Sequence, residues 1–437
     1  MPSLLRVGLA GLGTVGASVL NRIRLQQAAL EETTHRRIVV TGVSARSKAK
    51  AASLDLGEAT WFDDPIELAR SGDIDLFVEL MGGSGDPALT AVRHALSSGK
   101  AVVTANKALL AAHGMELATL AEERRVPLGF EASVAGGIPV VKTLREGLAG
   151  NVIDRVYGIL NGTCNYILSR MELEGLGFEQ CLAEAQRLGY AEADPTFDID
   201  GFDTAHKLAI LSTLAFGTAI AADAIHVEGI RTISLADIRA ADELGFRIKL
   251  LGVAQRVAGG IESRVHPTMV PKSSAIAQVM GVTNAVTVDA DAVRELTLIG
   301  PGAGGEATAS AVVADIADIA RGVRSAPFGR PVAALVPTAP VPLQRHEGGY
   351  YIRLNVEDRP GAVAAIAARM AERGISFESI VQRQPFGKAA DITPVRAVPV
   401  VLITYATTEE VIRQAIEAIM QDGWVTGRPQ SIRIERE

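Results

Sequence analysis

Cysteine, aromatic side chains and long apolar runs are all scarce in this chain of 437 residues. Two cysteines, Cys164 and Cys181, provide neither a disulfide framework nor a zinc site. No apolar run reaches the length of about 18 residues that a membrane-spanning helix needs. Aromatic residues make up only 4% of the chain, so alanine, valine, leucine and isoleucine must fill its cores.

An excess of positive charge is missing as well. The formal net charge of -7 argues against non-specific nucleic-acid binding. The apolar start of the chain, "MPSLLRVGLAGLGTVG", leads into glycines and a helical pattern, which is typical of a strand and turn rather than of a signal peptide. We therefore expect a cytoplasmic protein without membrane or nucleic-acid partners, with two or three domains.

A glycine motif stands in that first turn. A short apolar strand leads into Gly11-x-Gly13-x-x-Gly16, and a helical pattern follows. In a dinucleotide site the first glycine permits the tight turn, the second lets the backbone approach a pyrophosphate, and the third lets helix and strand pack closely. The motif predicts such a site, with Thr14 and Val15 among its contacts.

The end of the next strand indicates which nucleotide binds. A site for NAD usually has an acid there to hold the ribose hydroxyls, but residues 44–48 read "SARSK". The guanidinium of Arg46 can pair with a 2′-phosphate, which favours NADP, with NAD possible. The alternative is that Arg46 is a solvated surface residue.

The order of strand and helix patterns predicts the fold class. Strands alternate with helices over residues 1–130, which is typical of an α/β, Rossmann-type, doubly wound parallel sheet. Lys107 directly follows one of these strands, so its ammonium group should point into the crevice where ligands bind. The remaining segments are an α+β domain (131–325), a Pro- and Ala-rich linker (326–346) and a small βαββαβ domain (347–437). We expect the last helix of the α+β domain, about 305–322, to return to the first domain.

The stretch "GYAEADPTFDIDGFDTAHK", residues 189–207, gathers five carboxylates near one lysine. A calcium loop is excluded, because Lys207 stands where the bidentate glutamate would be. Helix capping explains Asp200 as a predicted N-cap and Asp203 as a first-turn acid. Asp203 and Lys207 are four residues apart and share one helix face. The other acids of the stretch are either solvated loop charges or part of a binding site.

An amino-acid-like substrate would use such a site. A zwitterion needs a carboxylate near its ammonium group, and a carbonyl that accepts a hydride needs a proton donor at its oxygen. Lys107 and Lys207 are candidate donors, and Glu192 is a candidate ammonium ligand. Beside a nicotinamide domain, these residues suggest the reduction of an amino-acid aldehyde or ketone.

Several longer motifs occur in one order along essentially the whole chain: "GLGTVG", "TANK", "FEASVAGGIPV", "NGTCNYI", the acidic stretch and "GPGAGG". Together they resemble homoserine dehydrogenase, and the C-terminal segment with "DRPG" resembles an ACT regulatory domain. The resemblance implies interconversion of L-aspartate 4-semialdehyde and L-homoserine with NAD(P)H, in the biosynthesis of threonine, methionine and isoleucine. It also implies a homodimer formed through the middle domain, or a higher homo-oligomer, and threonine as an effector.

The resemblance further implies roles for single residues. Lys207 would be the proton donor, Lys107 its partner at the reacting oxygen and also a cofactor contact, and Asp203 a catalytic carboxylate. Glu192 and Asp198 would bind the substrate, and Gly305 would return to the cofactor. A sodium ion is implied at four positions: Glu131 and the carbonyls of Val134, Gly136 and Ile138. Backbone oxygens and one carboxylate suit such a hard cation.

Two other classes of protein stay open. A lyase could use Lys207 as a Schiff-base amine, but it would not need the glycine motif. A ligand sensor without catalytic activity could use both the nucleotide fold and the ACT-like domain, but it would not need the two lysines and the acids.

Overall fold

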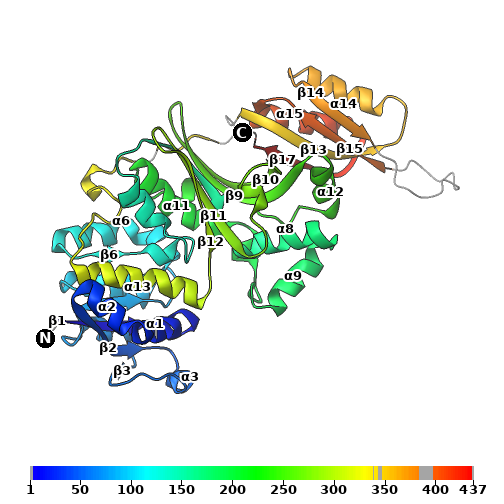
Figure 1. Cartoon of the computed structure of the whole chain (residues 1–437). Coiled ribbons are helices and arrows are strands. Elements are labelled where there is room, and N and C mark those ends of the chain that lie inside the picture. Colours follow the sequence, from blue (N-terminus) through cyan, green and yellow to red (C-terminus); the bar gives the residue numbers. More distant parts are fainter. Residues whose placement is uncertain (1–2, 338, 343–346, 383–396, 436–437) are drawn as a thin grey trace.

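The computed structural model describes residues 3–337, 339–342, 347–382 and 397–435. Figure 1 shows three parts: the N-terminal sheet with its helices, a middle part built on long strands, and a C-terminal lobe. Among the described residues, no helix combines the length and the apolar character needed to cross a bilayer.

The first sheet is parallel throughout, and its strand order is β3-β2-β1-β4-β5-β6. This order confirms the predicted doubly wound fold. Its central strands are buried and carry continuous apolar residues, as expected for a sheet covered on both faces. The strands are β1 (Ser3–Ala10), β2 (Arg36–Ser44), β3 (Thr60–Phe62), β4 (Leu76–Glu79), β5 (Ala101–Thr104) and β6 (Leu128–Gly129).

Helices cover both faces of this sheet. They are α1 (Thr14–Leu25), α2 (Gln27–Thr34), α3 (Lys48–Ala51), α4 (Pro65–Arg70), α5 (Ala88–Ser97), α6 (Lys107–Arg124) and α13 (Gly305–Arg321). The last of these follows the whole middle part in the sequence, yet it packs against α1 (Figure 1). Val312 and Ile316 of α13 belong to one buried cluster with Val7, Leu9 and Val78 of the sheet. Helix α13 therefore completes the core of the N-terminal part.

The middle part has a mainly antiparallel sheet in the order β12-β11-β7-β9-β10. Its strands are β7 (Ile153–Ile159), β8 (His226–Val227), β9 (Phe246–Val257), β10 (Gly260–Pro271), β11 (Thr283–Ala290) and β12 (Arg294–Pro301). Its helices are α7 (Val140–Lys142), α8 (Gly162–Glu174), α9 (Phe178–Arg187), α10 (Thr196–Ile199), α11 (Phe202–Phe216) and α12 (Leu235–Glu243). Short helical turns are η1 (Glu131–Ser133), η2 (Thr143–Gly147), η3 (Ala222–Ala224), η4 (Ile276–Gln278) and η5 (Val332–Ala334). Helix α11 is buried along nearly its whole length and packs across β7 and β9.

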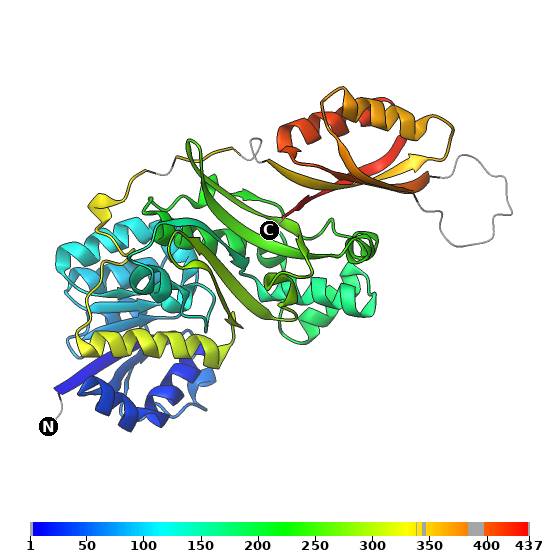
Figure 2. The same cartoon turned by 45° about the horizontal axis from the view of Figure 1, so that its top comes forward.

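The C-terminal lobe has the predicted βαββαβ order. It comprises β13 (Glu347–Glu357), α14 (Ala362–Ala371), β14 (Phe377–Gln382), β15 (Ala397–Thr404), β16 (Thr407–Thr408), α15 (Glu409–Gln421) and β17 (Val425–Ile434). Strand β17 pairs with β13 inside the lobe and also with β10 of the middle part, where Thr268 and Met269 face Arg433 and Ile434. The two sheets thus join into one of eleven strands, which Figure 2 shows as a continuous path between the lobes. No sequence pattern predicts this continuity.

Candidate active site

The glycine turn has the geometry that a dinucleotide site requires. Gly11 has a φ of +103°, and a Cβ there would lie 2.5 Å from the carbonyl oxygen of Leu80. A Cβ on Gly16 would lie 2.0 Å from the carbonyl oxygen of Gly11, so only glycine allows this close approach of helix and strand. In contrast, a Cβ on Gly13 would meet nothing within 4 Å. The turn is therefore open on one side, where the N-terminus of α1 can receive a phosphate.

Other predicted cofactor residues lie around this turn. Gly305, the first residue of α13, approaches α1 so closely that a Cβ there would lie 2.9 Å from the Thr14 methyl carbon. Val15 lines the cavity described next. Arg46 is exposed just beyond the end of β2, where Ser44 pairs with Ala10 at the start of the glycine turn.

A cavity of about 270 Å³ opens at the carboxyl ends of β4 and β5. This is the edge of a parallel sheet where ligands bind. Lys107 and Lys207 both line the cavity, although the first belongs to the N-terminal part and the second to α11. The other lining residues are Val15, Leu80, Met81, Gly82, Ala105, Asn106, Ala132, Ser133, Gly136, Gly302, Ala303 and Thr308.

The carboxylate of Asp203 joins the two lysines. One oxygen lies 2.7 Å from Nζ of Lys107 and the other 2.7 Å from Nζ of Lys207. Lys207 also donates to the carbonyl oxygen of Leu160 at 2.7 Å. Asn106, at the N-cap of α6, fixes the start of the helix that carries Lys107 by accepting from Leu109 N.

Burial and charge act in opposite directions on these groups. Burial acts to raise the pKa of Asp203, but the two ammonium groups outweigh it and hold that pKa well below its usual range. Burial lowers the pKa of Lys207, and the Lys107 charge adds to this effect. For Lys107, burial is outweighed by the Asp203 carboxylate, so the pKa of this lysine lies above its usual value. Lys207 is therefore the more acidic of the two ammonium groups.

Asn161 is a site residue whose role the sequence alone does not indicate. Its side-chain nitrogen donates to Asp198 at 2.8 Å and to Asp203 at 2.9 Å, and its oxygen caps α8 by accepting from Cys164 N. One residue thus ties the start of α8 to both carboxylates. It stands within the quoted motif "NGTCNYI", but its contacts join segments that lie far apart in the sequence.

The acids of residues 189–207 divide into separate groups. Asp198 is half-buried, and burial and the nearby Asp203 raise its pKa, whereas Glu192 is exposed. Asp194 accepts from Thr196 N within its own turn. The predicted N-cap role of Asp200 is wrong: this residue ends α10, pairs with Arg231, and leaves the N-cap of α11 to Gly201.

The sharp turn before α11 favours glycine over aspartate at the N-cap. Gly201 has a φ of +91°, a left-handed conformation that glycine adopts without strain. A Cβ there would also lie 3.0 Å from a Val227 methyl carbon and 3.1 Å from one of Val265. The chain turns sharply between α10 and α11 against neighbouring strands, and an aspartate side chain in place of Gly201 would be strained and crowded there.

A second missed residue, Glu79, is buried at the end of β4. Its carboxylate accepts from the Thr104 hydroxyl at 2.6 Å, from Met81 N at 2.7 Å and from Gly82 N at 3.2 Å. Met81 and Gly82 line the cavity, so Glu79 holds the turn that forms its wall. In the sequence this glutamate looks like any acid at a strand end.

The predicted cation ligands lie next to the cavity. The Glu131 carboxylate is buried and accepts from Val141 N and Lys142 N, each at 2.8 Å. Burial, together with the nearby Asp315, raises the pKa of Glu131 to about 7. The Ile138 carbonyl accepts from Val140 N at 2.8 Å.

The fold and the site together define a nicotinamide-nucleotide-dependent oxidoreductase. Comparisons with known families give the particular one. Residues 139–317 match the homoserine dehydrogenase family, residues 11–131 match its NAD-binding domain, and residues 350–423 match the ACT domain. The chain belongs to the homoserine dehydrogenase family and has a regulatory ACT domain.

Individual relatives agree with this assignment. A homoserine dehydrogenase of Pseudomonas aeruginosa is 44% identical over 99% of both chains. The crystal structure of a homoserine dehydrogenase from Thiobacillus denitrificans has a TM-score of 0.92 and 42% identity, covering 100% of this chain and 99% of that one. A hyperthermophilic archaeal homoserine dehydrogenase in complex with NADPH has a TM-score of 0.61 and 28% identity, covering 72% of this chain and 97% of that one.

Proposed function

We propose that this enzyme reduces L-aspartate 4-semialdehyde to L-homoserine with NADPH, with Lys207 as the proton donor. The observation that supports this proposal is the Asp203 carboxylate held between Lys107 and Lys207 at the edge of the cavity. The direct test is to follow NADPH absorbance when aspartate semialdehyde is added. A steady absorbance with the folded protein would contradict the proposal.

The residues at the cavity suit this reaction. The bound nicotinamide cofactor supplies a hydride, and negative charge then develops on the aldehyde oxygen. An ammonium group has three N–H donors, and Lys207 uses one on Leu160 and one on Asp203, which leaves one for that oxygen. Lys207 donates the proton as charge develops, while Asp203 keeps both ammonium groups in place.

The substrate's own ammonium group needs a carboxylate that is not already held by lysines. Asp203 is committed to Lys107 and Lys207. Among the described residues, the Asp198 carboxylate accepts a hydrogen bond only from the neutral Asn161 side chain. Glu192 is exposed, and its charge acts on the nearby Lys107. We assign Asp198 and Glu192 to the binding of the substrate ammonium group.

NADP is the cofactor that we expect the enzyme to prefer, because Arg46 is exposed beside the glycine turn. Replacing Arg46 by alanine should raise the KM for NADPH much more than the KM for NADH, since only NADPH carries the 2′-phosphate that a guanidinium binds. Steady-state kinetics with both cofactors measures this. Arg37→Ala, in the first half of β2, is the matched control and should change neither KM. Equal effects of Arg46→Ala on the two cofactors would show that Arg46 does not contact the 2′-phosphate.

Threonine is the effector that we propose for the ACT domain. The "DRPG" turn leads into α14, and Gly361 at its N-cap has a φ of +94°. A β-branched residue is strained in that conformation, so Gly361→Val should disturb the backbone N–H groups offered to an amino-acid carboxylate. We expect the threonine concentration for half-inhibition to rise at least about fivefold. Gly374→Val, at the other end of α14 and also at positive φ, is the control. Inhibition of both variants at the parent concentration would place the effector elsewhere.

We also propose a homodimer formed through the middle sheet. A hollow of about 480 Å³, lined in part by Tyr157, Leu251 and Val270, lies on this sheet and includes neither active-site lysine. The neighbouring strand β12 forms an outer edge of the sheet, and Ile299 on it is 54% exposed. A second subunit would cover the hollow and the exposed Ile299 side chain. Sedimentation as a 45.9 kDa monomer at micromolar concentration would contradict the proposal.

Sodium is the cation that we propose for the turn beside the cavity. Among the described residues, no backbone or side-chain donor bonds to the carbonyls of Val134 and Gly136, which leaves their oxygens for a hard cation. The Glu131 and Ile138 oxygens each accept a hydrogen bond and keep a further lone pair. Such an ion would stabilise the turn between η1 and α7. Equal melting temperatures in sodium and choline chloride of the same ionic strength would contradict this.

A further inference from the structure

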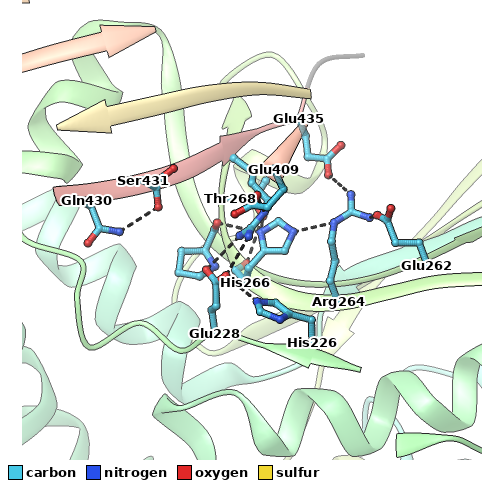
Figure 3. Close-up of polar contacts among 12 residues, drawn as sticks. His226, Glu228, Glu262, Arg264, His266, Thr268, Glu409, Gln430, Ser431 and Glu435 are labelled. Atoms are coloured by element: carbon cyan, nitrogen blue, oxygen red, sulfur yellow. Dashed lines mark hydrogen bonds and ion pairs between the residues drawn. The ribbon is translucent and has the colours of Figure 1, made fainter. Parts of the chain in front are cut away.

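The ACT domain contacts the catalytic part through a buried arginine. Arg433 lies on β17, and its side chain is only 5% exposed. It donates to both carboxylate oxygens of Glu228, at 2.9 and 3.1 Å, and to Glu409 of α15 at 2.9 Å. Figure 3 shows Glu409 above His266 of β10 and Glu228 below it. The arginine therefore joins a carboxylate of each part.

The charge of Glu228 is maintained in this position. Burial acts to raise its pKa, but hydrogen bonds from His226 and Arg433 outweigh burial and hold the pKa well below its usual value. A planar guanidinium that binds both oxygens also fixes the orientation of the carboxylate. The Glu228 carboxylate is thus ionised and held in one orientation where the catalytic part contacts the ACT domain.

Glu228 belongs to a short segment, residues 226–231, that we call the strap. One side of the strap follows β10, where Glu228 N donates to Val265 O at 2.7 Å. Its other side follows the end of α10, where Ile230 N donates to Ile199 O at 2.9 Å. A Cβ on Gly229 would lie 2.2 Å from that same oxygen, so the two backbones are in direct contact.

The end of α10 belongs to the substrate site. Asp198 stands one residue before Ile199, and its carboxylate accepts from Asn161, which also holds Asp203. Arg231, the last residue of the strap, pairs with Asp200 on the other side of Ile199. The strap therefore contacts the backbone of α10 directly beside Asp198.

We propose that Arg433 of the ACT domain is a positioning residue for the substrate site, acting through Glu228 and the strap on Asp198. The proposal rests on the assignment of Asp198 to the substrate ammonium group. If Arg433 has this role, the position of Asp198, and with it the affinity for the substrate, depends in part on the ACT domain. Lys107, Asp203 and Lys207 do not lie on the strap, so the loss of Arg433 should affect substrate binding more than the chemical step.

Arg433→Met in the full chain tests this dependence. We expect the KM for homoserine to rise about three- to tenfold, while the turnover number and the KM for NADP stay near those of the parent. Arg433→Lys keeps the charge and should lie between. If Arg433→Met fails to fold, the KM for homoserine is measured with Glu228→Gln instead, since this variant removes the carboxylate charge at the same contact. Adding Arg433→Met to Glu228→Gln should raise the KM no further, because both changes act on the substrate site through the Arg433–Glu228 pair.

Arg353→Met is the matched control. Arg353 lies on β13 of the ACT domain and also binds both oxygens of a catalytic-part carboxylate, Asp237 at 2.7 and 3.1 Å. Asp237 belongs to α12, which packs on α8 and β9. This variant should lose stability without raising the KM for homoserine. An equal rise in both variants would mean that general loosening of the domain causes the effect, and would overturn the proposal.

Asp198→Asn tests whether Asp198 binds the substrate ammonium group, independently of Arg433. It should raise the KM for homoserine more than Arg433→Met does. If Asp198→Asn raises this KM and neither Arg433→Met nor Glu228→Gln does, the positioning role is wrong and the assignment of Asp198 stands. If Asp198→Asn leaves the KM unchanged, the assignment of Asp198 is wrong and the positioning proposal falls with it.

Discussion

Replacing Lys207 by methionine is expected to lower the turnover number by about a hundred- to ten-thousand-fold, the usual cost of losing a positioned proton donor. Methionine keeps most of the side-chain length but has no N–H for the aldehyde oxygen. The glycine turn is untouched, so NADPH should bind nearly as in the parent. Turnover is measured at saturating substrate, and NADPH binding by fluorescence titration of the same preparation.

Lys249→Met is the control for the loss of a buried lysine as such. Lys249 is 1% exposed and donates to Asn165 and to the Val279 carbonyl, away from the cavity. It should lose stability and retain turnover when folded. Glu192→Gln should instead raise the KM for the substrate. If Lys207→Met turns over within about threefold of the parent, far short of the expected loss, its role as proton donor is wrong.

Asparagine at position 203 is expected to lower both stability and turnover. The change leaves Lys107 and Lys207 close together without their carboxylate, and breaking a buried pair in this way typically costs about 3–5 kcal/mol of unfolding free energy. The pKa of Lys207 should fall further, so that its ammonium form is lost at a lower pH. The basic limb of the pH–rate profile for aldehyde reduction should therefore move to lower pH.

The acid side of the stability profile gives a second measurement for Asp203→Asn. The folded state holds the pKa of Asp203 below its unfolded value of about 3.9. Its contribution to stability is thus fully present above that pH and is lost as the pH falls towards the folded pKa. The variant should lack this part of the profile. Asp200→Asn, which breaks the partly exposed pair with Arg231, should cost about 1 kcal/mol or less. Equal losses in the two variants would contradict the central role of Asp203.

The parts of the structure that the sequence could predict depend on local spacing. The turn from Gly11 to Gly16 is a feature of six consecutive residues, and the Asp203–Lys207 pair follows from one helical turn. Alternating strand and helix patterns predict the parallel sheet, whose order the structure confirms. The family resemblance rested on ordered motifs and is confirmed by the comparisons.

The parts that could not be predicted depend on contacts between distant segments. Lys107 and Asp203 meet only because the carboxyl end of β5 faces α11. Glu79 and Asn161 act through hydrogen bonds to residues in other elements, so the residues next to them in the sequence do not indicate their roles. Asp200 was misassigned because a carboxylate before a helix is the usual cap, whereas here a left-handed glycine makes the turn.

The return of α13 to the first sheet has a consequence for the folding order. The side chains of Val312 and Ile316 close the face of the sheet over Val7 and Leu9, and nearly the whole catalytic chain lies between these positions. A contact between such distant positions has a large loop-closure entropy and forms slowly. The nucleotide-binding unit is thus the first part of the chain to be synthesised, yet its core is sealed only after the middle part has been made. Its folding is therefore coupled to that of the substrate-binding part, and the two do not behave as independent units.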